Sequence, residues 1–121
     1  MSRRLAMAMA ILTWISGTAE ADNIYGSIAF SQSTGIDGYS YNYPNRNAAQ
    51  RRALKYCRGQ ASDCDVVVNF YNACGALAVG DGNGYGAAWA ASRRAAENQA
   101  LANCSVHTSS CYVQRWVCSG Q

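Results

Sequence analysis

Residues 45–57 read NRNAAQRRALKYC, and residues 92–104 read SRRAAENQALANC, so the two stretches match at an offset of 47 (92 − 45). Each stretch begins with a side chain favoured at helix N-caps, Asn45 or Ser92, and continues with Ala-rich sequence of high helix propensity. The two stretches therefore predict two helices that are copies of one pattern.

Both predicted helices carry a stripe of small apolar side chains. Spacings of i, i+4, i+7 and i+8 place residues on one face of a helix, and small side chains there permit close approach to a sheet. The stripes are Ala49, Ala53, Tyr56 and Cys57 in the first helix and Ala96, Ala100 and Cys104 in the second.

The match extends beyond the helices, from Gly35 and Gly82 to Cys64 and Cys111, at a constant offset of 47 (82 − 35). Strand-like segments rich in β-branched and aromatic residues flank each helix, two before it and one after it. The segments are GSIAF (26–30), YSYNY (39–43) and VVVNF (66–70), then GALAV (75–79), YGAAWA (85–90) and YVQRWVC (112–118).

The sequence thus predicts an α+β fold of two tandem ββαβ half-units. The half-units span residues 22–73 and 74–121, and we expect a pseudo-twofold relation between them. An antiparallel sheet packed with the two Ala-rich helices would place both apolar stripes in one domain.

The N-terminal residues have the pattern of a signal peptide. Two arginines precede a short apolar run, and Thr18 to Ala21 has the small side chains that signal peptidase cuts. Cleavage after Ala21 would leave 100 residues (121 − 21) with no retained membrane helix, which predicts a periplasmic or secreted protein. This part has eight Lys and Arg against six Asp and Glu, and so small an excess does not favour nucleic acid.

All six cysteines follow the predicted leader, and an even number in a small exported chain indicates disulfides. A zinc site is disfavoured because the chain has no CxxC pair and one histidine. Bridges across the short connections after each helix would pin that helix to its sheet, and the remaining pair would staple the two halves, although six cysteines allow fifteen pairings. The predicted bridges are Cys57–Cys64, Cys104–Cys111 and Cys74–Cys118.

The glycine-rich stretch GDGNGYG, residues 80–86, is predicted to be a hairpin turn. It lacks the third glycine of the dinucleotide fingerprint and the Lys of a Walker A loop. As a calcium loop it would place Ser92 where a bidentate Glu is needed. Asp-Gly and Asn-Gly are turn dipeptides, and the stretch lies between two strand-like segments.

Several of these segments together resemble a known family. GALAVGDGNGYGAAWA, the alanine and cysteine pattern that ends the helix, and the closing RWVCSG are similar to the small exported bacterial domains known as domain of unknown function 4189. The resemblance covers the whole chain after the leader. It implies a secreted or periplasmic location and no established catalytic activity, and the roles suspected in such families are host-directed secreted proteins and immunity-type partners of envelope toxins.

Residues suited to catalysis are few. His107 lies between two cysteines that we expect to be paired, and a base needs an oriented partner. Asp63 and Asp65 have the spacing of a carboxylate pair for glycoside hydrolysis, but acids solvated at the entry of a strand explain them better. We therefore predict no catalytic residue, metal or cofactor.

Two surfaces are candidates for binding a protein, which we expect to be acidic. Arg51, Lys55 and Arg58 form a basic stripe at i, i+4 and i+7, whereas the second helix has uncharged residues at the matching positions. Tyr39, Tyr41 and Tyr43 alternate along one strand, and tyrosine is frequent at interfaces. Solubilising cations and half-buried core tyrosines are the alternative interpretations.

These observations predict an exported, non-catalytic protein-binding domain. The specific form that we favour is an immunity or inhibitor protein against a toxin or hydrolase that acts on the cell envelope. One alternative is a secreted effector that acts on host cells. Another is a small extracytoplasmic hydrolase that uses Asp63, Asp65 or His107.

Overall fold

The computed structural model describes residues 23–120, and the predicted leader, residues 1–21, lies outside this range. The described chain forms six strands, two α-helices and one short 3₁₀ turn. In chain order they are β1 (Tyr25–Phe30), β2 (Asp37–Tyr43), α2 (Arg46–Arg58), β3 (Asp65–Tyr71), β4 (Cys74–Val79), η1 (Asp81–Asn83), β5 (Tyr85–Ala90), α3 (Arg93–His107) and β6 (Tyr112–Cys118).

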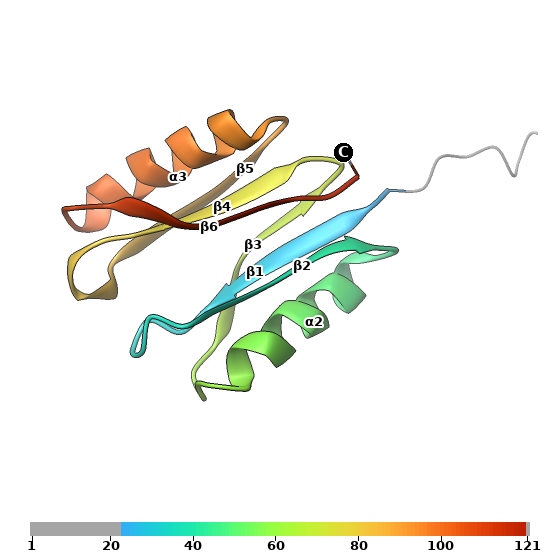
Figure 1. Ribbon diagram of the computed structural model, residues 1–121, viewed down its shortest axis with the longest axis horizontal. Coiled ribbons are helices and arrows are strands. Elements are labelled where there is room, and N and C mark those ends of the chain that lie inside the picture. Colours follow the sequence, from blue (N-terminus) through green and yellow to red (C-terminus); the bar gives the residue numbers. More distant parts are fainter. Residues whose placement is uncertain (1–22, 121) are drawn as a thin grey trace, which may run out of the picture.

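The strands form two antiparallel three-stranded sheets, ordered β2-β1-β3 and β5-β4-β6. Each sheet with its helix is one ββαβ half, as the sequence predicts, but the strands are divided between two sheets instead of one. The sheets face each other, and α2 and α3 cover their outer faces, which gives four layers (Figure 1). Strand β2 lies next to β6, and β3 lies next to β5, as a pseudo-twofold relation requires.

The helices begin at the predicted N-caps. The Asn45 side chain accepts a hydrogen bond from the Ala48 N–H, and the Ser92 hydroxyl accepts one from the Ala95 N–H. The stripe residues of both helices are buried, with one exception. Tyr56, which the sequence places in the first stripe, is 50 % exposed because it lies on the flank of α2 beside the edge strand β2.

Small residues fill the layer between each helix and its sheet. A Cβ on Gly38 of β2 would lie 2.2 Å from the Ala53 carbonyl oxygen of α2. A Cβ on Gly86 of β5 would lie 2.1 Å from the Cys104 nitrogen of α3. Glycine is therefore required at both positions by the close approach of a helix backbone, which the Ala stripes allow.

Large side chains fill the layer between the two sheets. The Phe70 ring of β3 lies where Cβ atoms on Gly26 and Gly75 would meet it, at 2.4 and 2.5 Å. Gly26 belongs to the same half as Phe70, whereas Gly75 belongs to the other half. The core between the sheets consists of Ile28, Phe30, Val68, Phe70, Leu77, Val79 and Val117.

All three predicted disulfides are present in the structure. Cys57–Cys64 and Cys104–Cys111 join the end of each helix to the strand that follows. The third bridge does not staple the two halves, and that part of the prediction is wrong. Cys74 begins β4 and lies directly opposite Cys118 of β6 in the same sheet, so the bridge lies within the second half.

The first half has an aromatic pair where the second half has this disulfide. Tyr25 begins β1 and lies opposite Tyr71 at the end of β3, as Cys74 lies opposite Cys118. The centroids of the two tyrosine rings are 5.5 Å apart. Within each sheet, the central strand is thus joined to an outer strand. A ring contact joins β1 to β3 in the first half, and a disulfide joins β4 to β6 in the second half.

The constant offset of 47 fails along β2. Gly38 and Gly86 occupy equivalent positions beneath their helices but are 48 residues apart (86 − 38). The additional residue is Asn42, which has a φ of 61° at a β-bulge between β1 and β2. The backbone N–H of Asn42 donates to the Ser119 hydroxyl and its side-chain oxygen accepts from the Gly120 N–H, so the bulge holds the end of the described chain.

The stretch GDGNGYG forms the predicted hairpin connection between β4 and β5. Gly82 and Asn83 have φ values of 65° and 63°, the left-handed region that glycine and asparagine tolerate. The turn also contacts the first half, because the Asn83 side-chain amide donates to the Gln32 carbonyl.

The packing of α3 on β5 predicts that position 86 must be glycine. We expect Gly86→Ala to lower the free energy of unfolding by at least about 1–3 kcal/mol, because the added methyl group overpacks the layer. Gly59→Ala is the matched control, since Gly59 has a helical φ of −64°, and should change stability by less than about 1 kcal/mol. Urea denaturation measures both values, and equal losses would contradict this account of the layer.

The disulfides should contribute unequally to stability. The Cys74–Cys118 bridge joins residues 44 apart in sequence, and Cys57–Cys64 joins residues 7 apart. Loop-closure entropy then predicts losses of about 4 kcal/mol on removal of the first bridge and about 2.5 kcal/mol on removal of the second. Denaturation of the two double Cys→Ala variants tests this order, which the opposite ranking would overturn.

Candidate functional site

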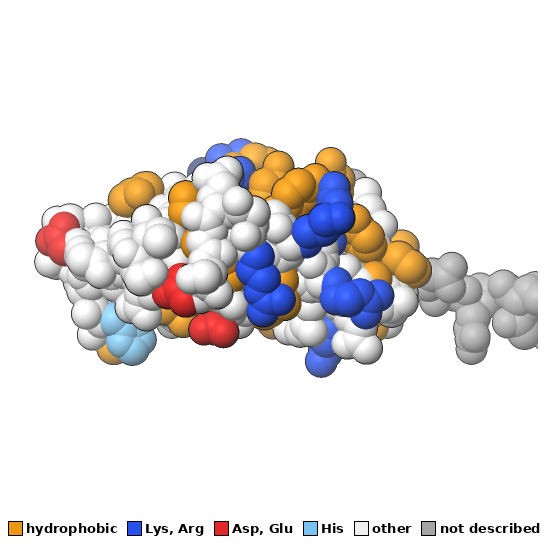
Figure 2. Space-filling view, turned by 90° about the horizontal axis from the view of Figure 1, so that it is seen from below, with side chains coloured by type: hydrophobic (Ala, Val, Ile, Leu, Met, Phe, Trp, Pro, Cys, Tyr) orange, Lys and Arg blue, Asp and Glu red, His pale blue; other side chains and the backbone are white. Residues whose placement is uncertain are grey.

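The basic stripe predicted on the first helix lies on the exposed face of α2. Arg51, Lys55 and Arg58 line one shallow hollow of about 600 Å³ together with Leu54 and Gly59. None of the three cations forms an ion pair or a side-chain hydrogen bond with another residue in the described range. Figure 2 shows Lys and Arg side chains spread over this side of the molecule, with the carboxylates toward the opposite end.

The three predicted tyrosines line a second hollow on the flank of the same helix. Tyr39, Tyr41 and Tyr43 border about 440 Å³ together with Arg52 and Tyr56 of α2. The alternation along β2 that the sequence suggests is interrupted, because the bulge at Asn42 separates Tyr41 from Tyr43.

Rings from both elements stack in this hollow. The centroid of the Tyr39 ring is 6.5 Å from that of Tyr41 and 6.2 Å from that of Tyr56. The Arg52 guanidinium lies over the Tyr56 ring at 4.2 Å, a favourable cation–π arrangement. Tyr41 and Tyr56 remain about half exposed, so this surface presents aromatic rings and a guanidinium to solvent.

Strand β6 of the other half supports the tyrosine hollow from behind. Arg115 lies over the Tyr39 ring at 4.4 Å, and its Nε donates to Asp37 Oδ1 at 2.9 Å. The second oxygen of Asp37 accepts from the Gln114 amide at 2.8 Å. Because the Asp37 side chain is only 5 % exposed, this pair fixes Tyr39 more firmly than a surface ion pair would.

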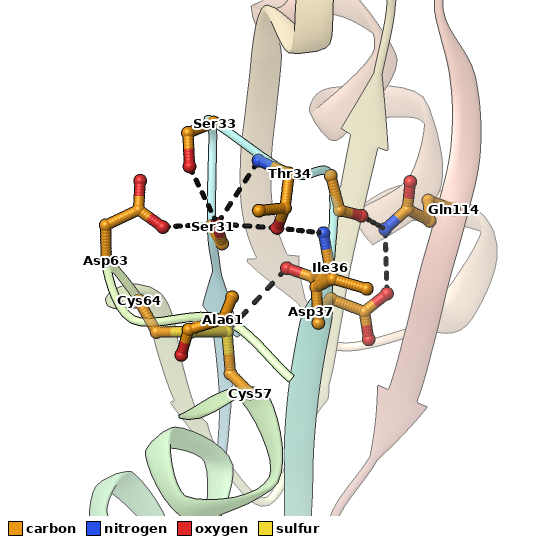
Figure 3. Close-up of a disulfide and its surroundings, with 11 residues drawn as sticks. Ser31, Ser33, Thr34, Ile36, Asp37, Cys57, Ala61, Asp63, Cys64 and Gln114 are labelled. Carbon is orange, nitrogen blue, oxygen red and sulfur yellow. Dashed lines mark hydrogen bonds between the residues drawn. A yellow bond between two sulfur atoms is a disulfide. The ribbon is translucent and has the colours of Figure 1, made fainter. Parts of the chain in front are cut away.

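Asp63 is held by the hairpin between β1 and β2 (Figure 3). The buried Ser31 hydroxyl donates to Asp63 Oδ1 at 2.5 Å and accepts from the Thr34 hydroxyl at 2.7 Å. Hydrogen bonds from Ser31, and secondarily from Ser33, hold the pKa of Asp63 below its usual value of 3.8. A depressed pKa does not suit the acid of a glycoside hydrolase, which must carry a proton at neutral pH.

The residues of the predicted hydrolase alternative border two neighbouring hollows. Asp63 and Asp65 line one, His107 lines the other, and both hollows include Gln32 and Tyr85. His107 ends α3, and its side chain forms no hydrogen bond or ion pair with any residue from 23 to 120. In that same range, no three His, Cys, Asp or Glu side chains come close enough together to hold a metal ion.

Comparison with known proteins agrees with the resemblance seen in the sequence. The model of the family described as domain of unknown function (DUF4189) matches residues 25–118, from the start of β1 to the end of β6. The chain belongs to the DUF4189 family. The match includes both halves, all six cysteines and both hollows on α2.

Curated relatives of this DUF4189 protein come from mycobacteria. Protein Rv1269c and Protein MT1307 of Mycobacterium tuberculosis and Protein Mb1300c of Mycobacterium bovis are each 46 % identical to it over 63 residues. The aligned part is 52 % of this chain and 48 % of each relative, so it spans about half the length of the relatives. No solved structure matches the chain significantly.

Sequence reasoning missed part of the surface that the DUF4189 fold assembles. Tyr56 was placed in the core stripe, and Arg115 was not singled out, yet both contact the Tyr39 ring. Tyr56 reaches Tyr39 through the packing of α2 on β2, and Arg115 reaches it through the contact of β2 with β6, and no local pattern encodes either contact. The spacing of Arg52 and Tyr56 at i and i+4 was the one signal available, because it places them side by side on a helix.

The helices between residues 23 and 120 are all too short or too polar to cross a bilayer.

The environment of Asp63 predicts a pH-dependent contribution to stability. Because its folded-state pKa is depressed, ionised Asp63 stabilises the fold above pH 3.8, and this is lost as the pH falls through the folded pKa. We expect Asp63→Asn to lower Tm near neutral pH and to converge with the wild type well below pH 3.8. Asp65→Asn is the matched control, since Asp65 makes no side-chain hydrogen bond in residues 23–120. A Tm difference that is constant from pH 7 to pH 2 would contradict this role.

Proposed function

We propose that this DUF4189 protein is a non-catalytic binding module that acts outside the cytoplasm by docking on an acidic protein. The observation that carries the proposal is the unpaired basic stripe of α2, Arg51, Lys55 and Arg58, on one exposed hollow. Helix α2 contains no acidic residue at all. An uncompensated row of cations beside an apolar side chain favours a surface of opposite charge.

The tyrosine hollow supplies the second part of the proposed docking surface. Tyrosine and arginine are enriched among the few residues that carry most of the binding energy at protein interfaces, and Tyr41, Tyr56 and Arg52 present both. Tyr39 is anchored from behind by Arg115, so the stack is preorganised and little side-chain entropy is lost on binding. Arg51 and Arg52 are adjacent along α2, which places the two hollows on neighbouring flanks of one helix.

The specific role that we favour is inhibition of, or immunity to, a toxin or hydrolase that acts on the cell envelope. Glycoside hydrolases work with pairs of carboxylates in open clefts. A rigid helix with three free cations and a tyrosine rim is complementary in charge to such a cleft. A secreted effector that binds a host protein would use the same surface, so the source of the acidic partner separates the two roles.

Charge reversal tests the basic stripe. The wild-type protein should capture an acidic partner from periplasmic or secreted fractions, and Lys55→Glu should weaken capture because it places like charges together. Arg94→Glu is the matched control, since it reverses one exposed cation on α3. The triple reversal of Arg51, Lys55 and Arg58 should weaken the purified complex by about tenfold or more in a titration at low salt.

Three results would contradict the proposal. The first is undiminished binding by the triple variant, and the second is an equal loss in Arg94→Glu. The third is turnover of a glycan or peptide substrate that is abolished by His107→Ala, which would identify the protein as a hydrolase.

A further inference from the structure

Three aromatic rings form a row across the boundary between the two halves, beside a hollow that is distinct from the two described on α2. The Tyr25 and Tyr71 centroids are 5.5 Å apart with planes inclined by 38°, and the Tyr71 and Trp89 centroids are 5.8 Å apart with planes inclined by 34°. Tyr71 is 41 % exposed and Trp89 is 47 % exposed. This aromatic row, Tyr25, Tyr71 and Trp89, joins β1 and β3 of one sheet to β5 of the other.

No guanidinium of the described chain is stacked on any ring of the aromatic row, in contrast to three other aromatic rings. Elsewhere in residues 23–120, arginines lie over the rings of Tyr56, Trp116 and Tyr39 at 4.2, 3.8 and 4.4 Å. Such a cation occupies a ring face that a ligand would otherwise use. Tyr71 and Trp89 lack this contact within that range, and both rings are partly exposed to solvent.

Unused hydrogen-bond donors lie beside the aromatic row. Arg46 and Asn69 line a hollow of about 100 Å³ with the three rings. The Asn69 side-chain oxygen already accepts from Ser27 and Gln50, which leaves its NH₂ group as the free part of the amide. Arg46 forms no ion pair or side-chain hydrogen bond within residues 23–120. The groups that remain available are donors, one of them charged, so they favour a ligand rich in acceptors and negatively charged.

We propose that the aromatic row binds a linear glycan that carries carboxylate groups. The C–H face of a sugar ring packs on an aromatic ring, and ring spacings of 5.5 and 5.8 Å are similar to the advance per sugar in an extended chain. Hydroxyl and carboxylate oxygens at the rim of the sugar then accept from Asn69 and Arg46.

The surroundings favour a glycan over other macromolecules. A stable protein interface buries about 800 Å² on each partner around an apolar centre, whereas the hollow beside the row has a volume of only about 100 Å³ and no aliphatic side chain lines it. Single-stranded nucleic acids also stack on aromatic rings, but they need a basic groove that follows the backbone. Arg46 is the one cation that lines this hollow in the described part of the chain.

Tetragalacturonate, a linear acidic tetrasaccharide, is the probe for this site, and its fully methyl-esterified form is the neutral comparison. In ¹H–¹⁵N NMR titrations, the acid should shift signals of Tyr25, Arg46, Tyr71 and the Trp89 indole. Trp89→Ala should weaken binding by about tenfold. Trp116→Ala is the matched control, because Trp116 is similarly exposed but covered by Arg93, and should change affinity less than twofold. Arg46→Gln should remove the preference for the acid over its ester.

The design separates this site from the proposed protein-binding surface and from folding defects. Lys55→Glu should not change the affinity for tetragalacturonate, and Trp89→Tyr should retain binding if Trp89→Ala fails to fold. The proposal is overturned if millimolar tetragalacturonate shifts no signal in the row, or if Trp116→Ala loses as much affinity as Trp89→Ala. Tighter binding of oligothymidylate than of tetragalacturonate would also overturn it.

Discussion

The packing of the Phe70 ring against Gly26 and Gly75 is the contact on which the arrangement of the two halves depends. Since each disulfide lies within one half, the halves are held together by the core between the sheets and by polar contacts at its margins. Phe70 comes from one half and Gly75 from the other, so both halves must be folded before this part of the core is complete. The Asp37–Arg115 pair adds a polar contact where β2 meets β6.

The two halves share their buried pattern and differ on their outer faces. Both helices bury two alanines and a cysteine against a glycine-bearing strand. On the exposed face, α2 has Arg51, Lys55 and Arg58, whereas the matching positions of α3 are uncharged. The shared packing explains the common backbone, and the unshared cations give the first half its own surface. Such a division is expected if one half mainly supports the other, and it agrees with the binding role proposed for α2.

Most of the fold could be predicted from local patterns, because caps, small-residue stripes and cysteine spacing act over short distances. Asn45, Ser92 and the bridge Cys57–Cys64 were all correctly predicted for this reason. The division into two sheets and the exposed position of Tyr56 depend on contacts between distant segments, which periodicity does not contain. The same limit applies to the candidate sites. The stripe on α2 is visible in sequence, whereas the contact of Tyr71 with Trp89 exists only after the halves pack.

The confinement of each disulfide to one half has a consequence for oxidation of a chain that emerges N-terminus first. The first half contains two cysteines, Cys57 and Cys64, which pair with each other and leave no thiol waiting for a distant partner. The four remaining cysteines all follow Tyr71, so a completed first half cannot exchange with them unless its bridge is attacked. Six cysteines allow fifteen pairings, but once Cys57 and Cys64 are joined, the last four cysteines allow only three. This arrangement lets a short chain reach its native bridges with little reshuffling.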